Sequence, residues 1–433
     1  MQLLVIRFEL NKILQSVQSI FGFCCGFNAN YYCRFCKSSK AEMQKLCMEN
    51  TATMRNEQNY EMDCKTNNFQ KTGIKEKSVF NDLTNFHVVC NPSVDLMHDF
   101  LEGVCHVIFC AIIFNFIYIR QLFTLKQFNT RLKSHYFGPL ERNTNIPLIT
   151  PKMLKNYKIR VSASEMLVLF THFALMIGDL VDPDIPEWRL YLLTREILAI
   201  ILEKKMHRET PKLLRSLISE HHELFKKLFS KNFTPKMHFA LHYPNIMERI
   251  GPLCHVSSMR FESYHKIFKN VIKNINCRKN LLKSCLFKLR MRYANFFLDF
   301  QSFFDSELKT GKLSRISREE IISNYRSDLA LPEVAFTTNM VERDSIVYKV
   351  GYVVQTGKTI DDTPIFALIT DVFIHEKNIF LGCQTLNVLG FSTHFHAFRV
   401  EKENFMFIKS TNRLYTRSSY LFQGVKDNFV MWD

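Results

Sequence analysis

The stretch Asn91-Pro-Ser-Val-Asp-Leu-Met-His-Asp-Phe-Leu-Glu-Gly103 marks the point where the chain becomes helical. Asn91 and Ser93 are residue types that cap helices, and the proline between them suits a first helical turn. The apolar residues after Asp95 recur at the spacing of a helix with one buried face. Because this periodicity continues to about residue 300, we predict that most of the central chain is helical.

The sequence changes character on either side of this region. Residues 1–40 are apolar and contain the clusters GFCCGF and YYCRFCK, whereas residues 41–90 are polar and are expected to form an irregular or weakly helical connector. Residues 301–343 are rich in charge and predict a linking helix and loop. Beyond Asp344 the apolar period changes to two, which predicts a small antiparallel barrel or sheet of roughly 90 residues. We therefore expect a mixed α+β fold in four segments: 1–90, 91–300, 301–343 and 344–433.

The composition is that of a folded, basic protein. Hydrophobic residues make up 47% of the 433, which is enough to bury a large core and excludes a disordered chain. The 57 Lys and Arg residues exceed the 41 Asp and Glu residues, giving a net charge of +16 at pH 7. A surplus of this size suits a polyanionic partner, and nucleic acid is the first candidate.

Cysteine usage and hydropathy bear on the compartment. The 13 cysteines form no disulfide framework of the kind found in short secreted chains, so we expect reduced thiols and an intracellular protein. Only six residues precede the first charge, too few for the apolar core of a signal peptide. The longest apolar run, from Val104 to Ile119, is shorter than a bilayer span and predicts a buried helix. We therefore expect no membrane segment.

A first candidate site combines Cys33 and Cys36 with His238 and His242. Two thiolates separated by two residues can bind one tetrahedral zinc ion, and two histidines four apart share one helical face. The four residues would then join distant parts of the chain through a structural zinc. Alternatively, the thiols are apolar core residues and the imidazoles are polar groups within a core, and the spacing alone supports both interpretations equally.

A second candidate site lies in the opening stretch. Asp95, His98, Asp99 and Glu102 are three or four residues apart and would share one helical face. Such a face could bind a divalent metal or a phosphate-bound ion. The alternative is an acidic first turn stabilised by the helix dipole, with His98 hydrogen-bonded locally, and the residues alone favour this alternative.

A third candidate is Glu262, which is the only acid in a strongly basic stretch. Ten Lys or Arg residues lie between Arg260 and Arg292, and Glu262 is their single acidic neighbour. A carboxylate in such a field stays ionised and could hold a metal ion beside a phosphate backbone. The alternative is a solvated basic helix with one salt-bridging Glu. The spacing of the helix places Lys266, Lys269 and Lys273 on one face and Ile267, Val271 and Ile275 on the opposite face.

Taken together, these segments resemble the transposases of animal CACTA (EnSpm) elements. The resemblance covers most of residues 22–300 and rests on five motifs in register: CRFCK from Cys33, NPSVDLMHDFLEGV from Asn91, VSASEML from Val161, PKMHFALHYP from Pro235 and GPLCHVSSMRFESYHKIFK from Gly251. The strand-rich C-terminal segment is similar to the tail of these proteins as well. The last motif also contains His265, which has no assigned role, like Asp95, His98 and Asp99.

The resemblance implies a ribonuclease-H-like catalytic core, DNA as the partner and a nuclear protein. In this family three acidic residues hold two metal ions, and a helical insertion separates the second acid from the third. Glu262 matches the third acid, and magnesium is expected only if the chain is catalytically competent. The order Cys33, Cys36, His238, His242 matches the zinc ligands of the related V(D)J-recombinase catalytic core, which favours zinc.

The sequence also departs from the pattern of this family at two of the three acidic positions. The stretch expected to carry the second acid reads ELNKILQSVQS from Glu9 and lacks Asp, and the first acid is expected upstream of Met1. Asp95 follows the cysteine pair and so does not match either. We therefore expect an incomplete, inactive ribonuclease-H-like core dominated by a helical insertion, with residual DNA binding through Arg260 and the lysine face.

Two alternatives remain open at this stage. The first is an active metal-dependent transposase or nuclease, in which the true N-terminus is longer or Glu9 or Asp95 supplies a ligand. The second is a zinc-stabilised interaction module that binds another protein through its C-terminal β segment. Homo-oligomerisation is compatible with each of these functions.

Overall fold

The computed structural model describes most of the chain and divides it into two compact units. The described residues are 18–24, 26–91, 94–138, 144–230, 232–275, 279–298, 308–327, 332–343, 346–376, 378–414, 419–424 and 427–431. The helical unit comprises Met1–Ser134, Asn145–Phe173 and Leu180–Ser263, and the β unit comprises His135–Thr144, Ala174–Asp179 and Tyr264–Asp433.

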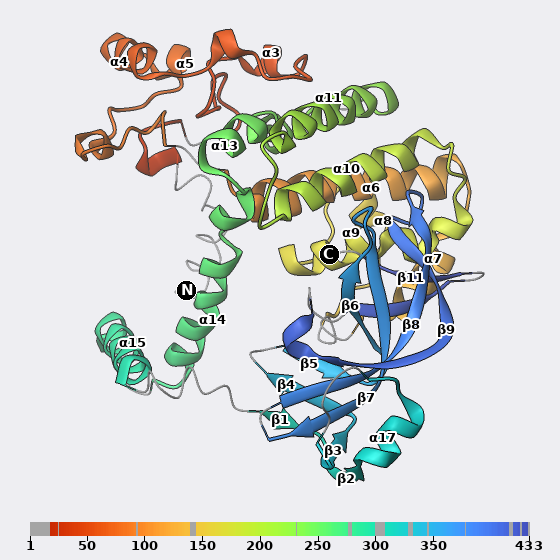
Figure 1. The fold of residues 1–433 in the computed structure, drawn as a ribbon. Coiled ribbons are helices and arrows are strands. Elements are labelled where there is room, and N and C mark those ends of the chain that lie inside the picture. Colours follow the sequence, from red (N-terminus) through yellow and green to blue (C-terminus); the bar gives the residue numbers. More distant parts are fainter. Residues whose placement is uncertain are drawn as a thin grey trace. The chain divides into compact units, whose positions relative to one another are not determined.

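Helices occupy most of the described helical unit (Figure 1). Their bounds are α3 Lys40–Met43, η1 Thr51–Thr53, α4 Glu57–Thr66, α5 Phe69–Thr72, η2 Val79–Asp82, η3 Leu96–Cys105, α6 His106–Phe114, η4 Asn115–Ile119, α7 Leu125–Ser134, α8 Pro151–Lys155, α9 Ala163–Ile177, η5 Gly178–Leu180, α10 Pro186–Leu202, α11 Thr210–Leu228, α12 Pro235–Ala240, α13 Tyr243–Ile250, η6 Leu253–Val256 and α14 Met259–Lys273. Helices α9 and η5 are divided between the two units, and most of α14 belongs to the β unit.

One continuous helical rod, η3–α6–η4, forms the centre of this unit. Its side chains from Val104 to Ile113 are largely buried, which confirms most of the buried helix predicted for Val104–Ile119, whereas Tyr118 and Ile119 at its end are exposed. Phe109 packs against Phe173 with ring centroids 5.0 Å apart, and Trp188 packs against Tyr191 at 4.9 Å. Helices α10 and α11 lie side by side. An aromatic core of this kind explains the high Phe content.

The start of the rod differs from the sequence prediction. Helix η3 begins at Leu96, and its N-cap is Asp95, whose carboxylate accepts a hydrogen bond from the Met97 amide at 3.1 Å. Asn91 instead accepts from the His87 amide at 2.8 Å, and Pro92 and Ser93 lie outside the described residues. Helix η3 is a π-helix, a form that occurs frequently at functional sites.

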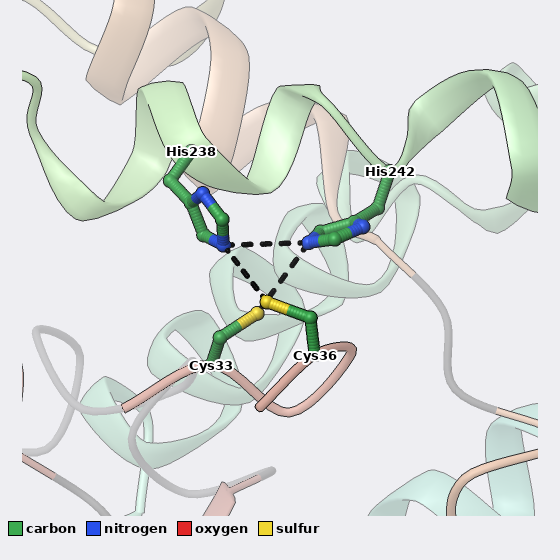
Figure 2. A group of neighbouring side chains, drawn as sticks. All are labelled: Cys33, Cys36, His238 and His242. Atoms are coloured by element: carbon green, nitrogen blue, oxygen red, sulfur yellow. Dashed lines mark hydrogen bonds between the residues drawn. The ribbon is translucent and has the colours of Figure 1, made fainter. Parts of the chain in front are cut away.

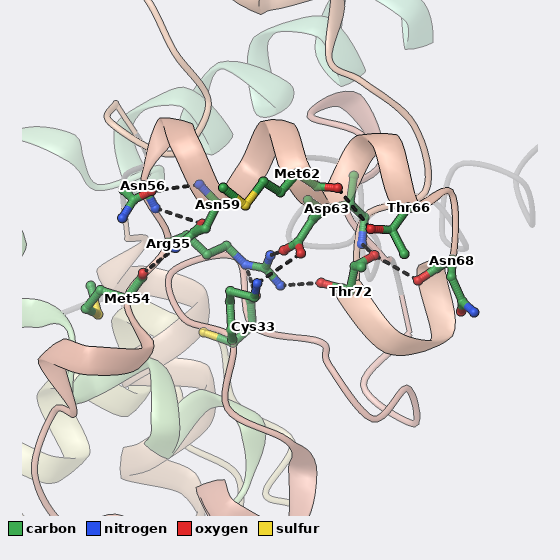
Figure 3. A network of polar contacts seen from close by, with 12 residues as sticks. Cys33, Met54, Arg55, Asn56, Asn59, Met62, Asp63, Thr66, Asn68 and Thr72 are labelled. Atoms are coloured by element: carbon green, nitrogen blue, oxygen red, sulfur yellow. Dashed lines mark hydrogen bonds and ion pairs between the residues drawn. The ribbon is translucent and has the colours of Figure 1, made fainter.

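Residues 41–90, expected to be a connector, have a defined structure built around Arg55 (Figure 3). Its buried guanidinium donates to the Cys33 carbonyl at 3.2 Å and to the Thr72 carbonyl at 2.7 Å, and pairs with Asp63 at 3.4 Å. Asn56 caps α4 through a capping box. This network holds the cysteine loop against the following segment, and a hydrophobic cluster of Phe23, Tyr60, Ile74, Val88 and Val89 packs beside it.

Antiparallel strands dominate the β unit, as predicted. Its further elements are α15 Leu281–Leu298, β1 Lys309–Thr310, β2 Ser314–Ser317, α17 Arg318–Asn324, β3 Val334–Thr338, β4 Met340–Arg343, β5 Ile346–Lys349, β6 Tyr352–Lys358, β7 Pro364–His375, β8 Asn378–Ser392, β9 Ala397–Ser410, η7 Thr411–Arg413, β10 Ser419–Gln423 and β11 Asn428–Val430. The mixed α+β class is therefore confirmed.

Six of these strands close into a barrel. The antiparallel pairings run β6–β7–β8–β9–β11–β10 and return to β6. Register shifts within β6, β7 and β8 supply the curvature that closure needs. A linking helix and loop was predicted for residues 301–343, but the described part of this segment forms β1 to β4 and α17. These strands have only two to five residues each, so they show little apolar alternation in the sequence.

Two helical stretches are long and apolar enough to cross a membrane. In Leu96–Ile119 and Ala163–Leu180 the most apolar windows are 67% and 61% buried inside the protein. Burial of this extent is typical of core helices.

Candidate functional site

The two cysteines and two histidines predicted as a metal site converge in the helical unit (Figure 2). All four are buried, and their ligand atoms lie within 4.8 Å of one another. The Cys33 Sγ is 3.5 Å from His242 Nε2, the Cys36 Sγ is 3.3 Å from His238 Nε2, and the two Nε2 atoms are 3.4 Å apart.

These separations match the edges of a zinc tetrahedron. Zinc bonds of about 2.3 Å to sulfur and about 2.05 Å to nitrogen imply N–N edges of about 3.4 Å and S–N edges of about 3.6 Å. The donor atoms therefore surround a space that fits one tetrahedral ion. The four residues fit a structural metal such as zinc.

Local structure orients each pair of ligands. The Thr234 side chain caps α12 by accepting from the Met237 amide, which fixes the helix that carries His238. The Phe35 amide donates to Cys33 Sγ at 3.4 Å, and Glu49 lies 2.6 Å from His242 Nδ1. A carboxylate behind a ligating imidazole sets its orientation and strengthens it as a ligand. Sequence reasoning missed Glu49, because no spacing connects it to the histidines.

The four groups of the cluster differ in their acid–base properties. Hydrogen bonding from Cys33 and from both imidazoles lowers the pKa of Cys36 despite burial. Burial, together with the charge of Cys36, raises the pKa of Cys33. Burial lowers the pKa of His238, which keeps that imidazole neutral. Burial would lower the pKa of His242, but its hydrogen bonds with Cys36 and Glu49 raise this pKa to about 8. Because zinc binds thiolates and neutral imidazoles, metal binding must release the protons of Cys33 and His242.

A second group of side chains brings Asp95 and His98 together with Glu262, 164 positions beyond His98. The His98 Nδ1 forms a short contact with the Asp95 carboxylate, and its Nε2 lies 3.0 Å from Glu262 Oε1. Both ring nitrogens therefore face carboxylates, which favours the imidazolium. Burial would lower the pKa of His98, but the Asp95 hydrogen bond and the charges of Asp95, Glu102 and Glu262 raise it.

Ser258 connects the two segments that meet here. Its hydroxyl donates to Asp95 Oδ2 at 2.7 Å, and its amide donates to Asp95 Oδ1 at 3.1 Å. These bonds, with the one from His98, lower the pKa of Asp95 although burial would raise it. Sequence reasoning did not single out Ser258, even though it lies in the same motif as Glu262. Asp95 and Ser258 together position the start of α14 against η3.

The remaining two residues of the predicted face have different surroundings. Asp99 is fully buried, and its carboxylate accepts from the Asp95 amide at 3.1 Å. Burial raises the pKa of Asp99 to about 6 despite the charge of Arg34. Glu102 is half-buried near Lys236, and burial raises its pKa. Asp95 therefore contacts both His98 and Asp99, whereas Glu102 acts on His98 through its charge.

Gly103 permits the close approach of α12 to η3. A Cβ at this position would lie 2.4 Å from the Lys236 Cδ, so a side chain larger than hydrogen would displace that lysine. Helix α12 carries His238, which means that the metal cluster and the Asp95–His98–Glu262 group are supported by neighbouring elements.

The basic helix predicted after Arg260 corresponds to α14. Lys269 and Lys273 are exposed and Ile267 and Val271 are half-buried, in agreement with the predicted two faces, whereas Ile275 is buried just beyond the end of the helix. Three further residues of the prediction have side chains outside the described part of the structure: Arg260, His265 and Lys266.

Comparison of the sequence with models of known protein families gives no match, and comparison with curated proteins gives none either.

Proposed function

We propose that this chain is a CACTA-type transposase-derived protein, related to ribonuclease-H-like transposases, that binds the DNA phosphate backbone without cleaving it. A structural zinc joins its distant segments, and the nucleus is the expected compartment. The proposal rests mainly on one observation, the convergence of Cys33 and Cys36 with His238 and His242. This arrangement is what the family order of the motifs predicts, and Glu262 follows the second histidine in that order.

Exposed charge in the β unit supports DNA as the partner. Lys269 and Lys273 project from α14 into solvent. Helix α15 adds exposed Lys283, Lys288, Arg290 and Arg292, with exposed Phe287 and Tyr293 between them. Cations of this density attract phosphates, and exposed aromatic rings can stack on bases.

DNA binding is tested by reversing the charge of the α14 lysine face. The triple variant Lys266→Glu, Lys269→Glu, Lys273→Glu is expected to bind duplex DNA about 100-fold more weakly and with a smaller salt slope, because three phosphate contacts are lost. Fluorescence anisotropy with an unrelated-sequence duplex at several salt concentrations measures both quantities.

A matched control has the same change of net charge elsewhere on the surface. The exposed Lys204, Lys205 and Lys227 of the helical unit can be changed to Glu together. If this control loses as much affinity as the α14 variant, binding reflects net charge alone and the proposed surface is wrong. Unchanged affinity in the α14 variant would reject the surface directly.

The proposed absence of cleavage is tested at Glu262. Its carboxylate pairs with His98, and among the described residues the groups able to share one metal ion do not include it. Two-metal phosphoryl chemistry requires several carboxylates around the scissile phosphate. We expect neither the wild-type protein nor Glu262→Gln to nick supercoiled DNA in Mg²⁺ or Mn²⁺. Nicking by the wild type that disappears in Glu262→Gln would instead favour the active transposase.

A further inference from the structure

The structure contains a second cluster of metal-ligating side chains, formed by Glu57, His87 and Cys90. We propose that these three residues bind a second zinc ion at an open site in the helical unit. One ligand atom from each residue lies within 4.8 Å of the others. Glu57 is exposed, and His87 and Cys90 are half-buried, so solvent can reach the site.

The spacing of two of these residues suits a single ion. The segment His87-Val-Val-Cys90 separates its two ligands by two residues, as Cys33-Arg-Phe-Cys36 does. The turn is closed by hydrogen bonds from the Cys90 and Asn91 amides to the His87 carbonyl, at 3.0 and 2.9 Å. Such a turn presents both side chains on one side, which is how zinc-binding pairs are commonly arranged.

The third residue comes from a helix whose position is fixed. Glu57 is the first residue of α4, and the capping box of Asn56 and Asn59 anchors that end of the helix. The Cys90 thiol already lies 3.1 Å from Glu57 Oε1, so the thiol and the carboxylate face each other without any rearrangement. A metal ion between them would replace the thiol proton, which is released to solvent.

The imidazole is also held in place. Asn81 Nδ2 lies 3.1 Å from His87 Nε2, and Asn81 Oδ1 accepts from the Val88 amide at 2.9 Å, which fixes the orientation of the amide group. The Tyr60 ring packs edge-on against His87 with centroids 5.1 Å apart. The Val89 amide also donates to His87 Nδ1 at 3.3 Å, so a metal bond at either ring nitrogen replaces one of these two hydrogen bonds, while the other keeps the ring in place.

The chemistry of the ligands indicates the kind of ion. A thiolate, an imidazole and a carboxylate together suit Zn²⁺, whereas Mg²⁺ and Ca²⁺ prefer oxygen ligands alone. Three protein ligands leave one tetrahedral position for water or another molecule. The first cluster differs, because its two cysteines and two histidines would fill all four positions. The second ion is therefore expected to bind more weakly and to exchange faster.

The test is the zinc stoichiometry of the untagged full-length protein. After equilibration with Zn²⁺ and removal of free metal, elemental analysis should give two equivalents for the wild type and one for Cys90→Ser. The control Cys254→Ser should retain two, because Cys254 donates only to the Glu203 carbonyl, which a hydroxyl can also do. Glu57→Gln, at an exposed position, should weaken the second binding step about tenfold or more.

Cobalt substitution provides an independent measurement. The second Co²⁺ equivalent should add thiolate-to-metal absorption in the wild type and none in Cys90→Ser. One zinc equivalent in both proteins, with unchanged cobalt spectra, would overturn the proposal. If Cys90→Ser fails to fold, Glu57→Gln decides: unaltered binding of the second ion in that variant would likewise reject the site.

Discussion

Replacement of Cys36 by Ser should abolish tight zinc binding and unfold much of the helical unit. Structural zinc contributes about 10–16 kcal/mol of apparent binding free energy in small zinc domains, which is more than the net stability of most domains. The Cys36 side chain forms hydrogen bonds with His238 and His242, about 200 residues further along the chain. Its replacement therefore removes one metal ligand and weakens the connection between the cysteine loop and the helices that carry the histidines. Circular dichroism and metal analysis of the purified variant measure both effects.

Two controls separate the metal from the thiol. Cys105→Ser changes an equally buried cysteine in the same unit and should retain zinc, with a loss of about 1–3 kcal/mol from the buried hydroxyl. Treating the wild type with a strong chelator should reproduce the unfolding seen in Cys36→Ser, and added Zn²⁺ should reverse it. A Cys36→Ser protein with wild-type zinc content and melting temperature would refute the structural role of the site.

Replacement of Asp95 by Ala should destabilise the protein by about 3–5 kcal/mol, because it removes one partner of a buried ion pair. Asp95 caps η3 through the Met97 amide, accepts two hydrogen bonds from Ser258 and pairs with His98. The alanine leaves all of these groups without their acceptor. Urea denaturation of the wild type and the variant gives the difference in the free energy of unfolding.

The pH dependence of this difference follows from the two pKa shifts. The pKa of Asp95 is lowered from 3.8, so its contribution is present above that value and is lost as the pH falls through the lowered pKa. The pKa of His98 is raised from 6.5, so its contribution is complete below 6.5 and is lost as the pH rises through the raised pKa. The effect of Asp95→Ala should therefore be largest between about pH 4 and 6.5.

Asp95→Asn distinguishes the cap from the ion pair. The amide oxygen can still accept from the Met97 and Ser258 amides, but the charge that stabilises protonated His98 is gone. This variant should lose less stability than Asp95→Ala, and its deficit should shrink above pH 7. A pH-independent deficit in both variants would show that His98 remains neutral and that the ion pair contributes little.

Several features of this protein could be predicted from short-range patterns in the sequence. The buried helix from Val104 follows from an unbroken apolar run, and the antiparallel strands beyond Asp344 follow from a period of two. The four candidate metal ligands could be predicted because each pair has a spacing set by local geometry, Cys33 with Cys36 and His238 with His242. Local spacing predicts such pairs, since the two ligands lie on one turn or one helical face.

Only the tertiary structure decided which pairs meet and what supports them. Glu49 behind His242, Ser258 on Asp95 and Glu262 on His98 all join residues more than 150 positions apart, and no periodicity encodes such contacts. The closure of the six-stranded barrel likewise depends on a long-range pairing, that of β10 with β6. Burial then determines the charge states, because Asp99 and Asp95 are the same residue type in one short motif, yet packing raises the pKa of Asp99 and hydrogen bonds lower that of Asp95.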